Sequence, residues 1–466
     1  NAPFSLTPLT GSTVGSGASA SFTAGSTGGK NVRYKWNFGD GTPETFFSTS
    51  PTVSHVFANP GRYLVTVTVT DDTGRTQTSS FYQGVSAPPT AVAPRSSGSI
   101  VVENRASGNA RVWVVNPDAD TVTVLDAVTR AKLAETAVGT SPRTLAVAPD
   151  GRVWVVCATS GTVSILSSNT FAVAQTLTLP RGSRPFGIAF DPQGGAAWLT
   201  LEQTGRLLKL HPSTGAVLAD ISVGKDVRHL SVNGAGNRVF VSRFITPPLP
   251  GEATANVNTA GKGGEIVVVD SAGSSIVKTI ILQHSELPDT SISGRGIPNY
   301  LGAPVITPDG LSAWVPSKQD NIKRGTLRDG QALTHDSAVR PIASRVDLTT
   351  LTEDYPARVD FNDAGTPTAV CHDPSGIFTF VALEGSRAVA VVDAWNHQEI
   401  TRFDAGRAPQ GLAVSADGKT LFVQNFMDRS VTAHDLSGLL NGGTNPPVLL
   451  GSVVTVAVEK LAANVL

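Results

Sequence analysis

The sequence predicts an all-β protein in which a small immunoglobulin-like β-sandwich is followed by a seven-bladed β-propeller. Three observations lead to this prediction. Short runs of alternating apolar and polar residues recur along the chain, 46 glycines and 30 prolines suit tight turns between strands, and one unit repeats seven times beyond residue 99. With 466 residues the chain is also too long for a single ordinary hydrophobic core.

Residues 1–87 have the pattern of the sandwich. Residues 34–41, with the sequence YKWNFGDG, predict a strand that carries Trp36 and Phe38 on one face and ends in an Asp-Gly turn. Further strands are expected over residues 53–57 and 64–71. Together these segments resemble the PKD domain. The resemblance implies a spacer or adhesion unit of an extracellular protein and implies no catalytic role.

Residues 88–98 are rich in proline, alanine and serine and predict a semi-stiff linker. Beyond the linker, each copy of the repeat has a glycine at the end of a Pro-Asp-Gly-like turn: Gly108, Gly151, Gly194, Gly236, Gly310, Gly376 and Gly418. Each glycine precedes a strand with one aromatic residue: Trp113, Trp154, Trp198, Phe240, Trp314, Phe380 and Phe422. A four-stranded unit of about 40 to 45 residues has the size of a propeller blade. Since one blade cannot bury its own faces, the seven are expected to close into a ring over residues 99–458.

Residues 112–126 and 421–435 resemble the YVTN repeat of bacterial exported propellers. This resemblance implies the fold and leaves the function open, because such propellers serve surface-layer proteins, enzyme subunits and lyases alike. Residues 453–458 are expected to be the outer strand of the last blade, and residues 459–466 a short helical tail. The junction at this tail resembles the one that precedes a cytochrome-c-peroxidase-like haem domain, which implies a possible haem domain C-terminal to this chain.

The bulk chemistry narrows the possible functions. Lys plus Arg number 36 and Asp plus Glu 37, which argues against nucleic-acid binding through overall charge. No apolar run approaches the roughly 20 residues of a membrane span. The chain begins at Asn1 without a signal peptide, as a processed export product or a trimmed chain would. The expected location is secreted, periplasmic or at the cell surface.

No cofactor is evident from the motifs. The chain has no P-loop, dinucleotide fingerprint or Cys-x-x-Cys-His haem motif, and its eight histidines form no recognisable metal set. Cys371-His372-Asp373 is not expected to form a zinc site, because neighbours in a strand point to opposite faces. Cys157 and Cys371 are expected to be buried free thiols in two different blades, and His211 a variant turn residue.

The repeat is interrupted by three insertions. The sequence distance from the aromatic residue to the end of the following strand is 13 residues in five copies, for example from 113 to 126. It is 30 residues in the fourth copy (240 to 270) and 33 in the fifth (314 to 347). The third insertion lies between Asp270 and Gly310. Because propeller strands alternate in direction, all three are expected on one face, where they would build a wall over blades four and five. Neutral loop drift is the alternative explanation.

The insertion-bearing face is rich in cationic and polar residues. The residues predicted to bind a ligand there are Arg243, His284, Arg295, Lys318, Asp320, Asn321, Arg324, Arg407 and Arg429. Arg143, Arg184 and Arg228 also start inner strands and are expected at the mouth of the central channel. Guanidinium groups suit the bidentate capture of carboxylate or phosphate. Alternatively, the arginines pair with Glu202, Glu384, Asp320 and Asp428 and only tie the blades together.

Three functions are compatible with these observations. The leading hypothesis is a non-catalytic recognition or scaffold protein that binds an extracellular protein, a glycan or an anionic small molecule on the insertion-bearing face. The second is an enzyme similar to lyase or lactonase propellers, with His284 or His335 as the base and Arg295 and Lys318 stabilising an oxyanion. The third is the propeller region of a larger exported haem redox protein.

Overall fold

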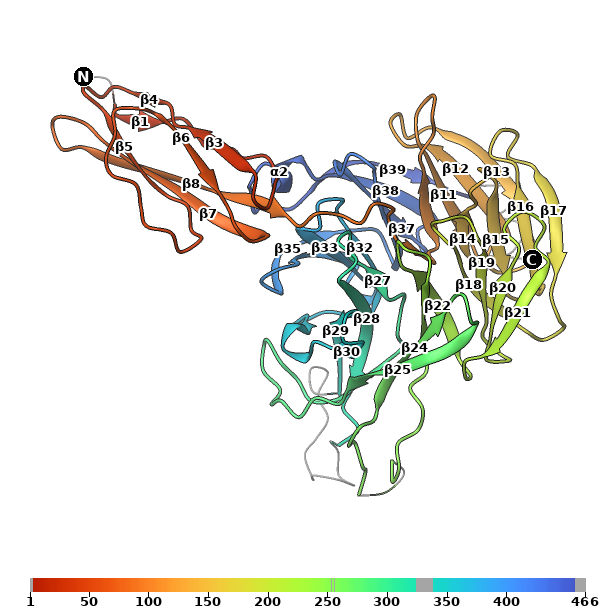
Figure 1. Ribbon diagram of the computed structural model, residues 1–466. Coiled ribbons are helices and arrows are strands. Elements are labelled where there is room, and N and C mark those ends of the chain that lie inside the picture. The colour runs from red at the N-terminus through yellow and green to blue at the C-terminus, as the bar shows by residue number, and fades with distance from the viewer. Residues whose placement is uncertain (1–2, 253, 255, 324–337, 457–466) are drawn as a thin grey trace.

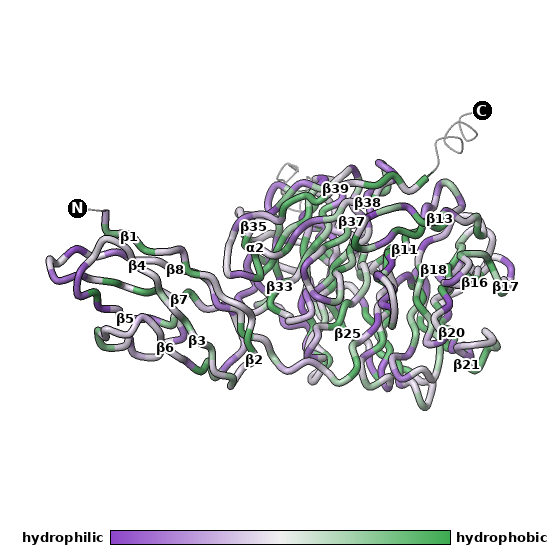
Figure 2. Tube along the Cα trace, turned by 90° about the horizontal axis from the view of Figure 1, so that it is seen from above, coloured by the Kyte–Doolittle hydropathy of each residue, from purple (hydrophilic) through white to green (hydrophobic). Residues whose placement is uncertain are grey.

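The computed structural model describes residues 3–252, 254, 256–323 and 338–456, and shows two lobes (Figure 1). The smaller, N-terminal lobe lies beside the larger one in Figure 2, with the linker between them. Almost all regular structure is β. Within the described residues the helical elements are α2 (Ser437–Leu440), η1 (Tyr355–Ala357) and η2 (Glu384–Ser386).

The N-terminal lobe is a β-sandwich, as the sequence predicted. Its strands are β1 (Ser5–Leu6), β2 (Val14–Gly15), β3 (Ser19–Thr23), β4 (Ser26–Thr27), β5 (Arg33–Asn37), β6 (Thr52–Val56), β7 (Gly61–Thr70) and β8 (Thr76–Ser86). They form one four-stranded sheet in the order β2-β8-β7-β5 and the pairs β3-β6 and β1-β4. Trp36 and Phe38 are both buried in its core with Phe22 and Phe57, which confirms that they share a face.

The larger lobe is a propeller of seven sheets within the described residues, arranged in a ring in chain order (Figure 1). The inner strands are β10 (Ile100–Glu103), β14 (Pro142–Val147), β18 (Pro185–Phe190), β22 (Val227–Val232), β27 (Val305–Ile306), β32 (Pro367–His372) and β36 (Pro409–Val414). The second strands are β11 (Arg111–Asn116), β15 (Val153–Cys157), β19 (Ala197–Leu201), β23 (Arg238–Arg243), β28 (Ser312–Asp320), β33 (Phe378–Leu383) and β37 (Thr420–Asn425).

The third and outer strands complete each sheet. The third strands are β12 (Thr121–Asp126), β16 (Thr162–Leu166), β20 (Arg206–Leu210), β24 (Gly263–Asp270), β29 (Val339–Asp347), β34 (Ala388–Asp393) and β38 (Ser430–Asp435). The outer strands are β13 (Lys132–Ala137), β17 (Val173–Thr178), β21 (Val217–Ser222), β25 (Ser275–Gln283), β30 (Thr352–Glu353) with β31 (Val359–Asp360), β35 (Gln398–Asp404) and β39 (Val448–Val454). The fifth sheet also contains β26 (Ile297–Asn299), paired with β28.

The repeated residues build the blades for local reasons. All seven repeat glycines have φ between +69° and +82°, a backbone conformation in which a Cβ would be strained, so glycine allows the tight turn between the first and second strands. The seven aromatic residues are at most 2% exposed and pack between neighbouring sheets. Turn formation and core packing therefore recur together in each copy.

The ring closes between the last sheet and the first. Gln424 Nε2 donates a hydrogen bond to the carbonyl of Val115 (2.7 Å), and Arg429 forms an ion pair with Asp118 (2.7 Å). Apolar residues of both sheets share one core cluster. The first and last sheets each consist of consecutive strands, so the ring closes through side-chain contacts between them and not through a strand that they share.

The end of the predicted linker is a strand of the propeller. Residues 95–96 form β9 (Arg95–Ser96), which pairs antiparallel with the inner edge of β22. Earlier in the linker, the Thr90 N–H donates to the carbonyl of Pro308 (2.8 Å). The linker thus enters the ring at the inner strands before the first blade begins.

The sandwich also contacts the propeller directly, beside the loop that follows α2. Arg62 Nη2 donates to the carbonyl of Gly443 (2.9 Å), and its guanidinium lies 3.7 Å from the centre of the Tyr82 ring. The Tyr82 N–H donates to the carbonyl of Gly442 (3.0 Å). The linker is therefore not the only connection between the two lobes.

One boundary differs from the sequence prediction. The outer strand of the last sheet is β39, Val448–Val454, and not residues 453–458. Pairing with β38 sets its start, since Asp435 faces Val448 in the register. The predicted tail at 459–466 lies outside the described residues, as do Arg324 and His335.

Candidate functional site

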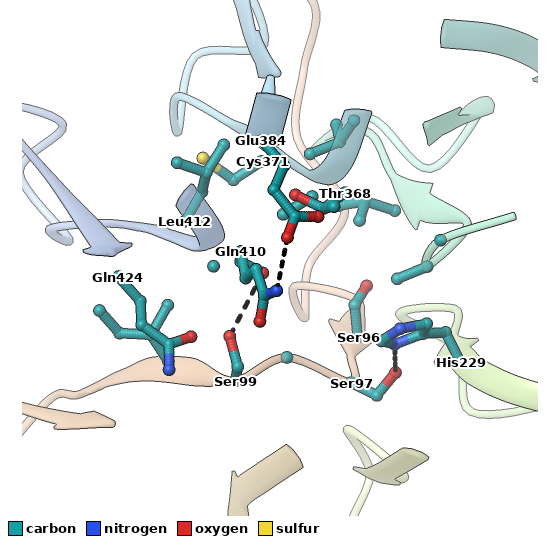
Figure 3. A pocket seen from close by; sticks show the side chains of 18 of the residues that line it. Ser96, Ser97, Ser99, His229, Thr368, Cys371, Glu384, Gln410, Leu412 and Gln424 are labelled. Carbon is teal, nitrogen blue, oxygen red and sulfur yellow. Dashed lines mark hydrogen bonds between the residues drawn. The ribbon is translucent and has the colours of Figure 1, made fainter. Parts of the chain in front are cut away.

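The inner strands surround a central cavity of about 960 Å³. The segment 95–99 forms part of its wall (Figure 3). The Leu145 N–H donates to the carbonyl of Gly98 (2.9 Å), and Ser99 Oγ donates to the carbonyl of Gln410 (3.3 Å). The linker therefore runs from the fourth sheet to the second and the seventh, and the cavity is bounded by the chain's own linker as well as by the blades.

A β-bulge near the start of five inner strands places residues on the cavity wall. In β14, β18, β22, β32 and β36 one extra residue follows the first pair of the antiparallel register. Bulges reorient side chains in this way. The cavity-lining residues at these bulges are Arg143, Phe186, Arg228, His229, Thr368 and Gln410.

The cavity wall is strongly cationic. Among the described residues it contains one carboxylate, Glu384, and six arginines: Arg95, Arg143, Arg184, Arg228, Arg387 and Arg407. The whole chain, by contrast, has a formal net charge of −1. The positive charge is therefore concentrated at this place, and four of these arginines were expected at the channel mouth from the sequence.

Arg184 and Arg228 both pair with the buried carboxylate of Glu202, and Arg143 lies near this cluster without such a contact. Arg228 Nε lies 2.7 Å from Glu202 Oε1, and Arg184 Nε lies 3.3 Å from Oε2. Arg143 has no hydrogen bond or ion pair with a described residue. Burial lowers the pKa of its guanidinium, and repulsion from Arg184 and Arg228 lowers it further, against the attraction of Glu202. Three guanidinium groups around one carboxylate leave two positive charges uncompensated.

Alternating cations and aromatic rings hold Arg228 in place. Its guanidinium lies 3.4 Å from the centre of the Phe244 ring, which stacks on Tyr300 at 4.5 Å. Lys318 Nζ covers Tyr300 at 4.0 Å. Such contacts stabilise cations on ring faces. Phe244 and Tyr300 belong to two of the insertions and both line the cavity, so the insertions help to shape its mouth.

His229 adds a neutral hydrogen-bond donor. Ser97 Oγ accepts the Leu230 N–H (3.1 Å) and lies 3.1 Å from His229 Nδ1. When the Ser97 hydroxyl donates to Nδ1, the ring proton of the neutral imidazole is on Nε2. Burial lowers the pKa of His229 to about 3, with a further contribution from Arg228. The imidazole is therefore neutral at physiological pH.

The opposite wall, from the sixth and seventh sheets, offers acceptors. Gln410 Nε2 donates to Glu384 Oε1 (2.8 Å; Figure 3), and Glu384 Oε2 accepts no hydrogen bond from a described residue. Thr368, which also lines the cavity, donates its Oγ1 hydrogen to the carbonyl of Pro409 (2.8 Å), so its hydroxyl oxygen can still accept. At the rim Arg407 pairs with Asp428. One side of the cavity is thus cationic, and the other combines the acceptors of Glu384, Gln410 and Thr368 with Arg387 and Arg407.

Most of the described residues that were predicted to bind a ligand lie in ion pairs, and of these described candidates only Arg407 is on the cavity wall. Arg243 pairs with Glu265 (2.6 Å), Lys318 with Asp320 (3.0 Å) and Arg429 with Asp118 (2.7 Å). Asn321 is buried at the start of the fifth sheet's insertion. These contacts agree with the alternative in which the charges tie blades and insertions together. The predicted role of these residues stays a prediction.

His284 and Arg295 come together around Glu286. His284 Nδ1 lies 3.3 Å from Glu286 Oε1, Arg295 Nε lies 3.6 Å from Oε2, and Lys323 also pairs with this carboxylate. The His284 side chain is 2% exposed. Burial lowers its pKa to about 4. This cluster joins the insertion between β25 and β26 to the segment that follows β28, and its residues are not among those that line the cavity.

The remaining polar candidates have structural roles. His211 Nδ1 accepts the N–H groups of Ser213 and Thr214 (both 3.3 Å), as aspartate does in other copies, which confirms a variant turn residue. Cys157 and Cys371 are free thiols in separate sheets. Burial raises the pKa of both thiols, that of Cys157 to about 11. The part of the chain that the structure describes contains no group of three or more metal-ligating side chains.

Sequence reasoning missed Phe186, His229, Thr368 and Gln410. A signal for three of them was present, because each directly follows or lies close to the proline that starts its inner strand, as Arg143 follows Pro142. Aligning the repeats on that proline would have marked the bulge position. His229 had no such signal, since Val227 replaces the proline in its blade.

Comparison with known proteins supports the architecture. Residues 4–83 match the PKD domain family. Hydrazine synthase of Kuenenia stuttgartiensis is similar in structure, with a TM-score of 0.58 and 17% identity, over 75% of this chain and 97% of that one. A functionally unknown protein from Desulfotomaculum acetoxidans has a TM-score of 0.52 and 14% identity, over 75% and 96%. Virginiamycin B lyase from Staphylococcus aureus has a TM-score of 0.46 and 14% identity, over 70% and 91%.

These findings confirm the predicted fold class and the N-terminal PKD domain. At such identities the structural neighbours show the fold alone. No curated protein sequence matches this chain significantly. A search of the described residues finds no helix with the length and apolar character of a membrane span.

Proposed function

We propose that this chain is an exported recognition protein that binds an anionic ligand in its central cavity without catalysing a reaction. The observation that carries the proposal is Arg143, a partly buried guanidinium that faces two other arginines and has no partner among the described residues. Charges are rarely buried without compensation. An anion supplied from outside would compensate this one.

The surroundings favour an anion further. Arg184 and Arg228 are held by Glu202, and Arg228 also by Phe244, so their positions are set before a ligand arrives. Preorganised donors bind more strongly because less entropy is lost on binding. The neutral His229 supplies an N–H donor on the same wall.

The absence of catalysis is proposed from the chemistry of the histidines. His229, on the cavity wall, has a pKa of about 3 and is a poor general base at neutral pH. His284, the base of the enzyme hypothesis, is buried in the cluster around Glu286. Location outside the cell is supported by the PKD domain, whose family resemblance implies extracellular use.

Calorimetric titration with sodium sulfate tests the proposal. At low ionic strength we expect one site with a dissociation constant of about 1 mM or tighter, because several charge-assisted hydrogen bonds meet a compact dianion. Sodium chloride at matched ionic strength is the control and should give no saturable heat. Absence of saturable sulfate binding, together with an unchanged melting temperature, would rule out an anion site.

A second candidate function is support of a further domain, such as the haem domain implied by the C-terminal resemblance. The outer strand β39 exposes four large apolar side chains, Val448, Leu449, Leu450 and Val454, whereas other outer strands expose at most two. Exposed apolar patches often mark contact surfaces. Replacing Leu449 and Leu450 with lysine should then remove self-association or domain contact, measured by sedimentation, and unchanged sedimentation would contradict this use of β39.

A further inference from the structure

The two walls of the cavity differ in chemistry, and the difference restricts the ligand. One wall presents the guanidinium groups of Arg143, Arg184 and Arg228. The other presents the carboxylate of Glu384, with one oxygen on Gln410 and the other without a partner among the described residues, beside Arg387 and, at the rim, Arg407, which pairs with Asp428. A ligand that is anionic throughout would suffer repulsion from Glu384. The favoured ligand therefore carries hydrogen-bond donors away from its negative charge.

Hydroxyl groups are the donors that the remaining polar side chains fit best. Ser96 Oγ accepts a hydrogen bond from Ser231 Oγ (2.8 Å), which leaves its own hydroxyl hydrogen to donate into the cavity. Thr368 Oγ1 already donates to Pro409 and can accept. Donors and acceptors thus lie close together around the wall (Figure 3), as sugar hydroxyls, which both donate and accept, require.

We infer that the cavity binds an acidic sugar, with its carboxylate at Arg143, Arg184 and Arg228 and its hydroxyls at Glu384, Gln410 and Thr368. This inference rests on the proposed function and names the ligand class of the same site. A cavity of about 960 Å³ is large enough for more than one sugar unit. The wall formed by residues 95–99 contributes its serine hydroxyls to the same ligand.

The test compares three ring compounds of similar size by calorimetry. D-Glucuronate has the carboxylate and the hydroxyls, cyclohexanecarboxylate has only the carboxylate, and D-glucose has the hydroxyls without a charge. We expect glucuronate to bind at least about 10-fold more tightly than cyclohexanecarboxylate, since hydrogen bonds to charged groups have this strength, and glucose to show no saturable binding. Equal affinities for the two carboxylates would overturn the acidic-sugar inference and leave the anion site intact.

The Glu384→Gln variant distinguishes the contribution of the Glu384 wall to binding from that of the arginine wall. Its amide oxygen can still accept from Gln410, but the charge that attracts hydroxyl donors is gone. We expect the advantage of glucuronate over cyclohexanecarboxylate to fall to about 2-fold or less, with sulfate affinity unchanged or higher. The control is Glu399→Gln, which removes a carboxylate paired with Arg402 on the outer strand β35, and should leave all affinities unchanged.

A zwitterion is the competing ligand, because Glu384 would also attract an ammonium group. The probe is trans-4-aminocyclohexanecarboxylate. If it binds more tightly than glucuronate and loses that advantage in Glu384→Gln, the site takes a zwitterion and the acidic-sugar inference is wrong. If neither this compound, glucuronate nor sulfate binds, the proposed anion site itself fails.

Discussion

Replacing Arg143 with glutamine is expected to raise the melting temperature of the protein and, at the same time, to weaken its binding of sulfate. The substitution removes a partly buried charge that repels Arg184 and Arg228. We expect a gain of about 0.5–1 kcal/mol, or roughly 1–3 °C, at low ionic strength. The sulfate dissociation constant should rise about 10-fold or more, because a charge-assisted hydrogen bond is lost. Thermal unfolding and calorimetry measure the two effects.

The opposite signs separate a binding role from a structural one. Ligand sites are often less stable than their scaffold, whereas an arginine that ties blades together stabilises the fold. A fall in melting temperature would therefore contradict the assigned role of Arg143. The gain should also shrink at high salt, because salt screens the repulsion. Arg206→Gln is the control, because it breaks an exposed ion pair with Asp220 on the third sheet. This variant should show no rise in melting temperature and no loss of sulfate affinity.

Replacing Glu202 with glutamine should have the larger effect on stability. The carboxylate is 6% exposed and contacts both Arg184 and Arg228, so its loss leaves three clustered guanidinium groups without a counter-charge. Breaking a fully buried pair costs about 3 kcal/mol, and because solvent reaches both arginines here we expect a loss of about 1–2 kcal/mol. We expect a clear drop in melting temperature and, because a bound anion replaces the missing charge, a larger stabilisation by sulfate than in the unmodified protein.

Matched ionic strength distinguishes stabilisation by bound sulfate from general screening of charge by salt. The comparison is sodium sulfate against sodium chloride at equal ionic strength, measured by thermal unfolding. Asp428→Asn is the control, since it removes a carboxylate from Arg407 at the opposite, more exposed rim, where such pairs contribute less than about 1 kcal/mol. Equal sulfate stabilisation of Glu202→Gln and the unmodified protein would mean that the anion does not bind at this cluster.

The fold was predictable because its signals are local. Each repeat glycine is required by a turn with positive φ a few residues away, and each aromatic residue packs against the neighbouring copy. Trp36 and Phe38 likewise follow from alternation within one strand. Signals of this kind recur at a fixed spacing in the sequence, so seven imperfect copies were enough to identify the propeller.

The site was only partly predictable because its contacts are distant in sequence. Ser96 and Ser231 are 135 residues apart, and nothing in the linker's composition indicates that it pairs with an inner strand. The bulges that turn Arg228 and His229 to the cavity depend on register, which periodicity does not reveal. The charged residues of the insertions suggested a binding site, but residues such as Arg243 form ion pairs within the insertions.

Crystals of the protein grown in selenate provide the most direct test of the anion site. Selenium has a strong anomalous signal, so an ordered selenate can be located without assumptions about the ligand. The expected result is a peak within hydrogen-bond distance of Arg143 that is lost in Arg143→Gln crystals. A cavity without an anomalous peak at saturating selenate, or peaks confined to other surfaces, would contradict the assignment of this cavity as an anion-binding site.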